Sequence, residues 1–262
     1  MKINSLFDLS NQKILLTGAT GHLGLSILKT LLNFDAHVYV NSKNKKKVGD
    51  LIKHYKKKGK KVSPAIFDIN DFKKVKLFFK KNKTFHTVIN NANESDPGHF
   101  EVFNKKSYEK SFKVGVTSVA HLVHCAKQSL KNGAKENGSS SIINIASMYG
   151  VVSPNPSNYP KKNMNNPVHY GSSKASLIQY TRYASVYLAK YKIRVNSISP
   201  GAFPNKKVQN NKIFIKKLES NVPLNRIGVP NDLDTSIIFL STSNSSYITG
   251  INLLVDGGWT TW

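Results

Sequence analysis

The sequence predicts an α/β fold in which a doubly wound parallel sheet carries helices on both faces. Short apolar runs alternate along the chain with segments whose apolar residues recur at helical spacing. A glycine-rich turn at residues 18–24 follows the first apolar run and precedes the first helical segment. Because strands that alternate with helices form parallel βαβ units with right-handed crossovers, we expect one sheet of seven strands.

Each expected strand is a short apolar run bounded by polar or turn residues. Strands are expected at residues 13–17, 37–40, in a run ending at 67–68, and at 87–90, 141–146, 193–198 and 252–255. Helices are expected at 23–33, over the lysine-rich stretch after the second strand, and at 72–81, 107–130 and 170–191, with two more before the last strand. No repeat or linker interrupts the pattern, so residues 1–262 are predicted to form a single domain.

Composition narrows the class of protein. With 262 residues and 39% hydrophobic content, the chain can bury a substantial core. It has no long apolar run and no cleavable leader pattern at its start, which predicts a cytoplasmic protein with no membrane span. The single cysteine, Cys125, forms no internal disulfide, which agrees with a reducing compartment.

The formal net charge of +25 invites a nucleic-acid interpretation. Arginine, however, occurs only at Arg182, Arg194 and Arg226, and the many lysines are scattered along the chain rather than gathered in one stripe. We therefore expect no specific nucleic-acid partner and no metal site. The positive field is expected to attract anionic cofactors and small-molecule substrates.

Tyr170 and Lys174 are the first candidate catalytic pair. They lie four residues apart in a segment with helical spacing, so both side chains project from one helix face. An unperturbed tyrosine has a pKa of about 10, and a neighbouring cation favours the phenolate, which brings the group closer to use as a general acid or base. The alternative is an ordinary exposed helix face, because this spacing is common.

The glycine-rich turn is the candidate cofactor site. Glycines between a first strand and a first helix let the backbone turn tightly and approach a pyrophosphate, which then lies at the positive end of the helix dipole. The predicted contacts are Gly18, Thr20, Gly21, His22, Leu23 and Gly24.

The end of the second strand distinguishes between cofactors. An acidic residue there would bind the ribose hydroxyls of NAD, whereas a basic residue suits the extra phosphate of NADP. This chain has Ser42 and Lys43 and no acid, so NADP(H) is preferred over NAD(H). The alternative is that Lys43 is one more surface lysine.

With these motifs in view, the chain resembles the compact branch of the short-chain dehydrogenase/reductase family nearly from end to end. The resemblance rests on the glycine turn, on Tyr170-x-x-x-Lys174, and on matching segments at 67–69, 89–92, 143–147, 194–201 and 256–258. It implies a Rossmann-type fold and a homodimer or homotetramer.

The resemblance also implies roles for single residues. Ser147 would hydrogen-bond the substrate oxygen, Tyr170 would transfer its proton, and Lys174 would hold the nicotinamide ribose and lower the pKa of the tyrosine. Asp68 and Ile69 match the adenine-contacting pair, and Asn91 and Ala92 lie beside the cofactor ribose. Pro200, Gly201 and Phe203 are predicted to line the nicotinamide end of the site.

Three positions depart from the family pattern. His22 occupies the place of the compact branch's middle glycine, and Asn93 stands where glycine follows Asn-Asn-Ala. Gly115 replaces an asparagine whose backbone holds a water of the proton relay, but a relay through the backbone carbonyl survives a change to glycine. The sequence therefore predicts an active enzyme.

Two segments are expected to cover the substrate. The loop at about 150–168 is rich in proline, asparagine and serine and is flanked by the catalytic residues, so it suits a polar, hydroxyl-rich substrate. A lid is expected at about 202–221, the family's substrate-covering position. Met148, Tyr149 and Tyr159 are the predicted substrate contacts.

These observations predict an NADP(H)-dependent oxidoreductase that interconverts a ketone and a secondary alcohol. The loop and its flanking motifs look similar to bacterial family members of surface-carbohydrate synthesis, which favours a sugar or nucleotide-sugar substrate. One alternative is a 3-oxoacyl-carrier-protein reductase, because an acidic carrier suits the basic surface. Another, from a different class, is a non-catalytic NADP(H)-binding regulator or scaffold.

Overall fold

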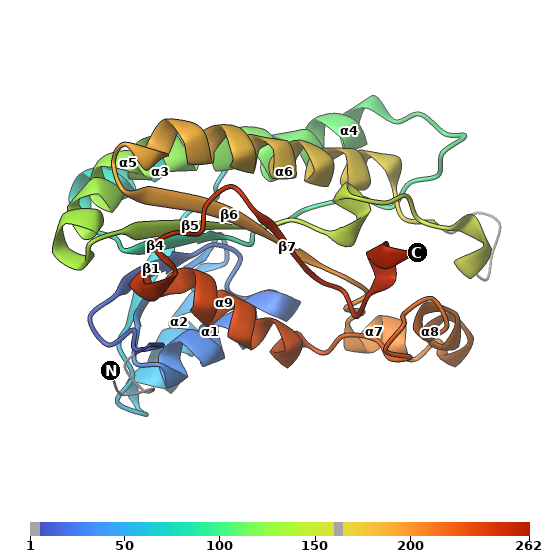
Figure 1. The fold of residues 1–262 in the computed structure, drawn as a ribbon, viewed down its shortest axis with the longest axis horizontal. Coiled ribbons are helices and arrows are strands. Elements are labelled where there is room, and N and C mark those ends of the chain that lie inside the picture. Colours follow the sequence, from blue (N-terminus) through green and yellow to red (C-terminus); the bar gives the residue numbers. More distant parts are fainter. Residues whose placement is uncertain (1–5, 160–164) are drawn as a thin grey trace.

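A seven-stranded, fully parallel sheet forms the centre of the molecule. The computed structural model describes residues 6–159 and 165–262. The strands run in the spatial order β3-β2-β1-β4-β5-β6-β7 (Figure 1). They are β1 (Lys13–Leu16), β2 (His37–Ser42), β3 (Val62–Ile66), β4 (Thr87–Asn90), β5 (Ser140–Ile145), β6 (Ile193–Pro200) and β7 (Asn252–Val255). The predicted doubly wound parallel sheet is confirmed.

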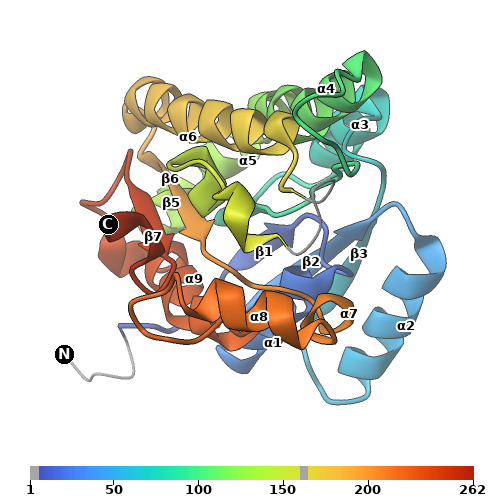
Figure 2. The ribbon, with the colours of Figure 1, turned by 90° about the vertical axis from the view of Figure 1, so that its right-hand side faces the viewer.

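Helices cover both faces of this sheet (Figures 1 and 2). One face carries α3 (Phe72–Lys81), α4 (Lys105–Phe112), α5 (Ser118–Asn137) and α6 (Val168–Ala189). The other carries α1 (His22–Asn33), α2 (Lys45–Lys56) and α9 (Asp234–Ser241). Two short helices, α7 (Lys206–Gln209) and α8 (Lys212–Glu219), lie beyond the carboxyl end of β6.

Side-chain alternation along the strands divides the interior into two cores. On β1, Leu15 packs into the core under α3, α5 and α6, whereas its neighbours Ile14 and Leu16 pack into the core under α1 and α9. Because successive strand residues point to opposite faces, a strand covered on both sides has no solvent-facing positions. This is why β4 and β5 are buried at every position.

The segment expected as one helix at 107–130 is divided in the structure. The chain forms α4, then one π-helical turn at Lys113–Thr117, and then α5, which continues to Asn137. Gly115 is buried in the π turn. Such turns bend a helix and change the direction of its carbonyls, and periodicity alone does not reveal them because the apolar spacing continues through the turn.

The strand order creates a crevice at the carboxyl edge of the sheet. From β1 the chain winds outward to β2 and β3, and it then returns to β4 on the other side of β1. The connections after β1 and β4 therefore leave on opposite faces, and ligands of open α/β sheets bind in the gap between them.

Two helical glycines test how closely the layers are packed. At Gly49 of α2 an added Cβ would meet no other atom within 4 Å, so Gly49→Ala is expected to stabilise the fold by about 0.5–1 kcal/mol through helix propensity. At Gly133 of α5 an added Cβ would overlap the backbone oxygen of Phe85, so Gly133→Ala is expected to destabilise by about 1–3 kcal/mol. Urea unfolding of both variants measures the two signs, and a stabilised Gly133→Ala would contradict the close contact between α5 and the chain before β4.

Candidate active site

Ser147 and Tyr170 reach one cavity from two different elements. Ser147 follows β5 and begins a short 3-10 turn at Met148–Gly150, where its Oγ accepts a hydrogen bond of 3.2 Å from the backbone N–H of Tyr149. Tyr170 lies in the first turn of α6. Both side chains line the cavity at the carboxyl edge of the sheet, so a hydroxyl and a phenol converge on one space.

The environment of Tyr170 sets its acidity. Burial raises the pKa of the phenol, because the low-dielectric surroundings disfavour the phenolate. A hydrogen bond with the Ser147 side chain acts in the opposite direction and lowers the pKa. The Lys174 Nζ lies 5.6 Å from the centre of the Tyr170 ring, close enough for a positive charge to favour the phenolate further.

Lys174 is a buried cation anchored by a backbone carbonyl. Its Nζ donates a hydrogen bond of 2.8 Å to the Ile145 carbonyl oxygen, and only 3% of the residue is exposed. Burial lowers the pKa of Lys174 from 10.5 to about 8. An ammonium has three N–H donors, and Ile145 accepts one of them. The others are suited to the hydroxyls of a bound ligand.

The cavity has a volume of about 650 Å³, which is within the usual range for a ligand site. Every residue predicted to bind a cofactor lies in its wall, together with Ser147. The set comprises Gly18, Thr20, Gly21, His22, Leu23, Gly24, Ser42, Lys43, Asp68, Ile69, Asn91, Ala92, Tyr170, Lys174, Pro200, Gly201 and Phe203. The binding roles of these residues stay predictions, but their convergence from segments far apart in sequence is a property of the fold.

The glycine turn is packed against the end of β4. Gly18 has a φ of +62°, and a Cβ on it would lie 2.7 Å from the Cα of Ala92. A Cβ on Gly24 would overlap the Gly18 carbonyl oxygen. The Asn91 Nδ2 donates to the carbonyl oxygens of Thr17 and Gly18 at 3.0 and 3.1 Å. The glycines are therefore needed for packing within the protein, which is a constraint in addition to the close approach of a phosphate.

The donors beside this turn fit a dinucleotide. Helix α1 begins at His22 directly after Gly21, so its first backbone N–H groups and its positive dipole end face the cavity wall. The Thr20 hydroxyl donates to the Ser42 hydroxyl at 3.1 Å, and Lys43 follows Ser42 in the same wall. Hydroxyls, backbone N–H groups and a lysine are the groups that bind phosphate oxygens.

Several residues of the cavity wall were not predicted from the sequence. Asn41 is fully buried, and its Nδ2 donates to the carbonyl oxygens of Ala65 and Phe67 at 2.8 and 3.1 Å, which joins β2 to β3 beneath the site. The other unpredicted wall residues are Phe67, Asn70, Asn93, Glu94, Val114, Ile145, Ala146 and Asn205. An asparagine inside an apolar strand pattern was the one signal in the sequence that could have identified Asn41.

The predicted substrate contacts lie outside the described cavity wall. Met148 is 2% exposed, because its side chain packs under the lid with Leu218 and Trp259. The Tyr149 and Tyr159 hydroxyls lie 3.5 Å from each other, and neither residue lines the cavity that holds the Ser147 hydroxyl. A substrate role for these three residues stays a prediction.

The substrate loop and the lid contact each other directly. The ring of Tyr159 lies 5.4 Å from that of Phe214 in α8, and the Lys217 Nζ donates to the Ser157 carbonyl oxygen at 3.0 Å. The Asn221 Nδ2 donates to the Asn158 Oδ1 at 3.0 Å. The loop prediction at 150–168 also covers residues 160–164, which lie outside the described residues. The lid expected at 202–221 contains two short helices, α7 and α8.

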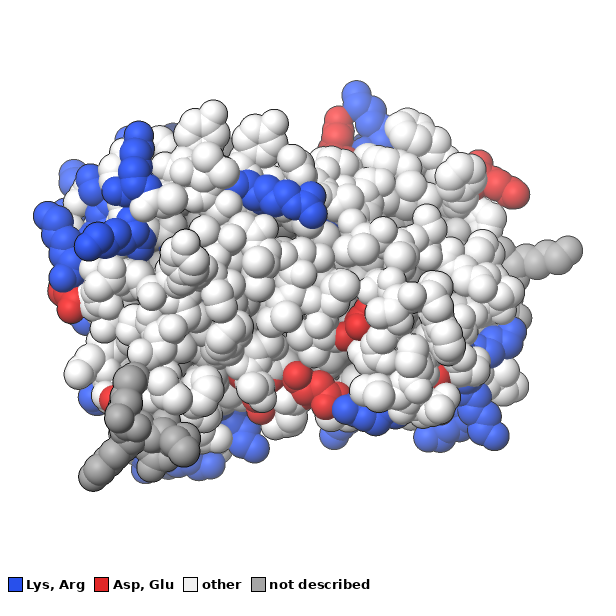
Figure 3. Space-filling view, viewed as in Figure 1, with Lys and Arg blue, Asp and Glu red and all other residues white. Residues whose placement is uncertain are grey.

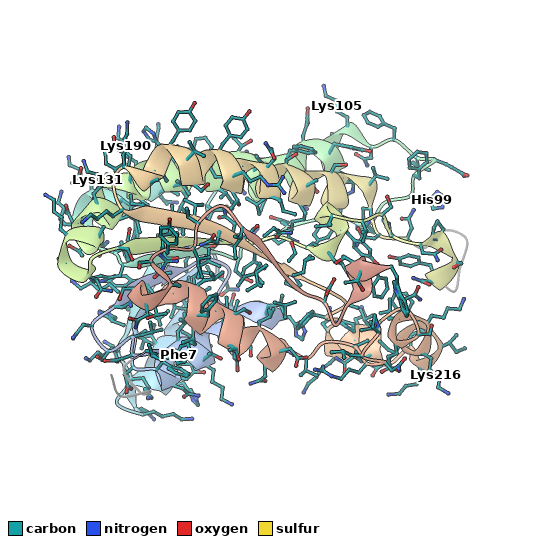
Figure 4. All side chains as sticks on the ribbon, viewed as in Figure 1. Phe7, His99, Lys105, Lys131, Lys190 and Lys216 are labelled. Atoms are coloured by element: carbon teal, nitrogen blue, oxygen red, sulfur yellow. The ribbon has the colours of Figure 1, made fainter. Side chains whose placement is uncertain are left out.

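Lysines cover several parts of the surface rather than one groove. Blue side chains gather at both ends of the face shown in Figure 3. In the side-chain view, Lys131 and Lys190 project at one end of the molecule and Lys105 and Lys216 at the other (Figure 4).

Among the described residues, no helix is sufficiently long and apolar to cross a bilayer.

Comparison with known proteins agrees with this geometry. The family model described as enoyl-(acyl carrier protein) reductase matches residues 18–260. Dehydrogenase/reductase SDR family member 4 of Caenorhabditis elegans is 31% identical over 259 residues, which cover 93% of each chain. A short chain dehydrogenase of Leptospira borgpetersenii, solved with bound NAD+, has 30% identity and a TM-score of 0.84 over 99% of this chain and 96% of its own. A gluconate 5-dehydrogenase of Burkholderia cenocepacia J2315, solved with NADP and tartrate, has a TM-score of 0.87 and 22% identity over 99% of both chains.

The fold and the site thus define an oxidoreductase with an NAD(P)-binding Rossmann fold. The chain belongs to the short-chain dehydrogenase/reductase family, as its sequence motifs predicted.

The buried ammonium of Lys174 makes a stability prediction. Below about pH 8 the folded protein buries a charged amine, which costs free energy; the cost decreases between pH 8 and 10.5, as the folded protein loses the proton before the unfolded chain does. Lys174→Met is therefore expected to stabilise the free protein by roughly 1–3 kcal/mol at pH 7, a figure that the loss of the hydrogen bond to Ile145 reduces. The stabilisation should be smaller at pH 10. Thermal unfolding at both pH values measures this, with the exposed Lys212→Met as the control. A stability change that is independent of pH would contradict the assignment.

Proposed function

We propose that the protein is an NADP(H)-dependent oxidoreductase that interconverts a ketone and a secondary alcohol on a polar, hydroxyl-rich substrate, such as a sugar or nucleotide-sugar in surface-carbohydrate synthesis. The single observation that carries the proposal is that Ser147, Tyr170 and Lys174 line the same cavity as the glycine turn and the start of α1. The chain thereby places an acid/base group beside donors suited to a dinucleotide.

Each catalytic residue has a separate task. The Ser147 hydroxyl holds the substrate oxygen, and its hydrogen bond to Tyr170 keeps the phenol directed at that oxygen. Tyr170 gives its proton to the oxygen in reduction and takes it in oxidation. The Lys174 ammonium, held by the Ile145 carbonyl, stabilises the phenolate that forms and binds ribose hydroxyls. The nicotinamide, when bound, supplies or accepts the hydride.

Residues of the glycine turn and of the end of β2 support NADP(H). The Thr20 and Ser42 hydroxyls, 3.1 Å apart, and the Lys43 ammonium provide donors and a positive charge for the ribose phosphate. Solved relatives of similar fold include one with NADP and one with NAD+, so the preference rests on the residues of this chain.

Polar groups at the substrate end support a hydroxylated substrate. Asn205 lines the cavity, as the Ser147 hydroxyl does. A second candidate is reduction of a 3-oxoacyl carrier protein. The description of the matching family model names a carrier protein, and the net charge of +25 would attract an acidic carrier.

Kinetics with Tyr170→Phe test the proposed chemistry. We expect the wild type to reduce keto sugars with NADPH faster than with NADH. The variant should lose at least about 100-fold in kcat because it lacks the transferable proton, while NADPH affinity stays within about two-fold because the ring remains.

Faster turnover of an acetoacetyl thioester than of any keto sugar would favour the carrier-protein reductase. Cofactor binding without turnover of any carbonyl or polyol would leave a non-catalytic regulator.

We also propose that the chain forms a homodimer or homotetramer in the cytoplasm through the outer face of α6. Tyr183, Val186 and Tyr187 share one side of this helix and are 60%, 74% and 68% exposed. The opposite side of the helix is buried against the sheet, so this exposed group of large side chains is a second packing surface of α6. The unpaired thiol of Cys125 suits the reducing cytoplasm.

Val186→Glu tests the interface, because it places a charge in the centre of this stripe. We expect light scattering to show a smaller assembly for Val186→Glu than for the wild type. Ile213→Glu introduces the same change on the equally exposed face of α8 and should leave the assembly intact. A monomeric wild type, or equal effects of the two variants, would contradict the interface.

A further inference from the structure

A salt bridge spans the cofactor cleft at its adenosine end. The Lys43 Nζ lies 3.3 Å from the Glu94 Oε2. Lys43 follows β2 and Glu94 follows β4, and these strands flank β1 on opposite sides. The bridge therefore passes over the carboxyl end of β1, where the glycine turn lies, and both residues line the same cavity as that turn.

Glu94 has a second cation partner. Its Oε1 lies 3.3 Å from the Nζ of Lys110 in α4, and the same Nζ lies 2.6 Å from the Asp96 Oδ1. If Lys43 moved away, the Glu94 carboxylate would remain paired with Lys110. The bridge can therefore open without leaving an isolated charge on the side of β4.

We propose that Glu94 is a specificity-determining residue for the cofactor, the counter-ion that Lys43 exchanges for the ribose phosphate of NADP(H). The inference rests on the proposed NADP(H)-binding function and deepens it. Glu94 competes with the phosphate for Lys43 and repels it from the opposite wall. It therefore weakens NADP(H) binding, and it has no such effect on NAD(H), which brings no phosphate to this position.

Charge and exposure determine the direction and size of the exchange. A phosphate monoester carries a charge of about −1.5 to −2 at pH 7, more than one carboxylate, so Lys43 favours the phosphate when NADP(H) is bound. The side chains of Lys43 and Glu94 are 62% and 40% exposed. Pairs in such positions contribute little free energy, so removing the competitor should change affinity by a small factor that decreases with added salt.

Fluorescence titration with NADPH and with NADH tests the exchange without relying on turnover. Glu94→Gln keeps the size and removes the charge. It is expected to tighten NADPH binding about two- to five-fold in low salt and to leave NADH binding within error of the wild type. Lys43→Met should weaken NADPH binding, and in that background Glu94→Gln should lose most of its effect.

Asp96→Asn is the matched control. It removes one negative charge from the same loop, but Asp96 contacts Lys110 and not Lys43 in the described interactions. If Glu94 acts through Lys43, Asp96→Asn should leave the ratio of NADPH to NADH affinities unchanged. A general effect of net charge would instead shift the ratio equally in Glu94→Gln and Asp96→Asn.

Three outcomes would overturn the exchange: equal effects of Glu94→Gln on NADPH and NADH, an unreduced effect in the Lys43→Met background, or an equal effect of Asp96→Asn. The failure of the proposed function is a different result. A wild type that binds both cofactors but turns over no carbonyl would contradict the proposed function and leave the Lys43–Glu94 coupling measurable. A wild type that prefers NADH would contradict the NADP(H) preference alone.

Discussion

One hydrogen bond aligns the two elements that carry the proposed catalytic side chains. It joins the Lys174 Nζ on α6 to the Ile145 carbonyl oxygen at the end of β5. Ser147 lies two residues beyond Ile145, and Tyr170 lies one helical turn before Lys174. The bond therefore holds the end of β5, which leads to the serine, close to the part of α6 that carries the tyrosine. It does so with a buried ammonium, whose desolvation cost makes the site less stable in the free protein than an apolar contact would be.

The sequence predicted the sheet and most of the cavity wall because both depend on local signals. Strands covered on both faces are buried along their whole length, as β5 is, and their apolar residues mark them in the sequence. Most predicted binding residues lie at the end of a strand, just after it, or near the start of a helix, and in a parallel sheet the carboxyl ends of the strands meet at one edge. Asp68 and Pro200 could thus be assigned to one site, although they are far apart in the chain.

Features that depend on packing between distant elements could not be predicted. The π turn around Gly115 keeps the helical spacing of apolar residues, so periodicity continues through it. A Cβ added to Gly115 would lie 3.3 Å from the Ser173 hydroxyl oxygen. That hydroxyl donates a hydrogen bond of 2.8 Å to the Tyr170 carbonyl oxygen. The sequence marked Gly115 as a departure from the family pattern. Only the structure shows that the glycine lies against the turn that carries the proposed catalytic tyrosine.

Lys43 and Lys174 show why residue type alone does not define a role in a chain with so many lysines. Lys43 is largely exposed and paired with a carboxylate, so its partner can be exchanged. Lys174 is buried and bonded to a carbonyl, so its geometry is fixed and its pKa falls to about 8. The same type of side chain thus provides an adaptable contact at one end of the cavity and a rigid one at the other. Burial and the choice of partner, both products of the strand order, make the difference.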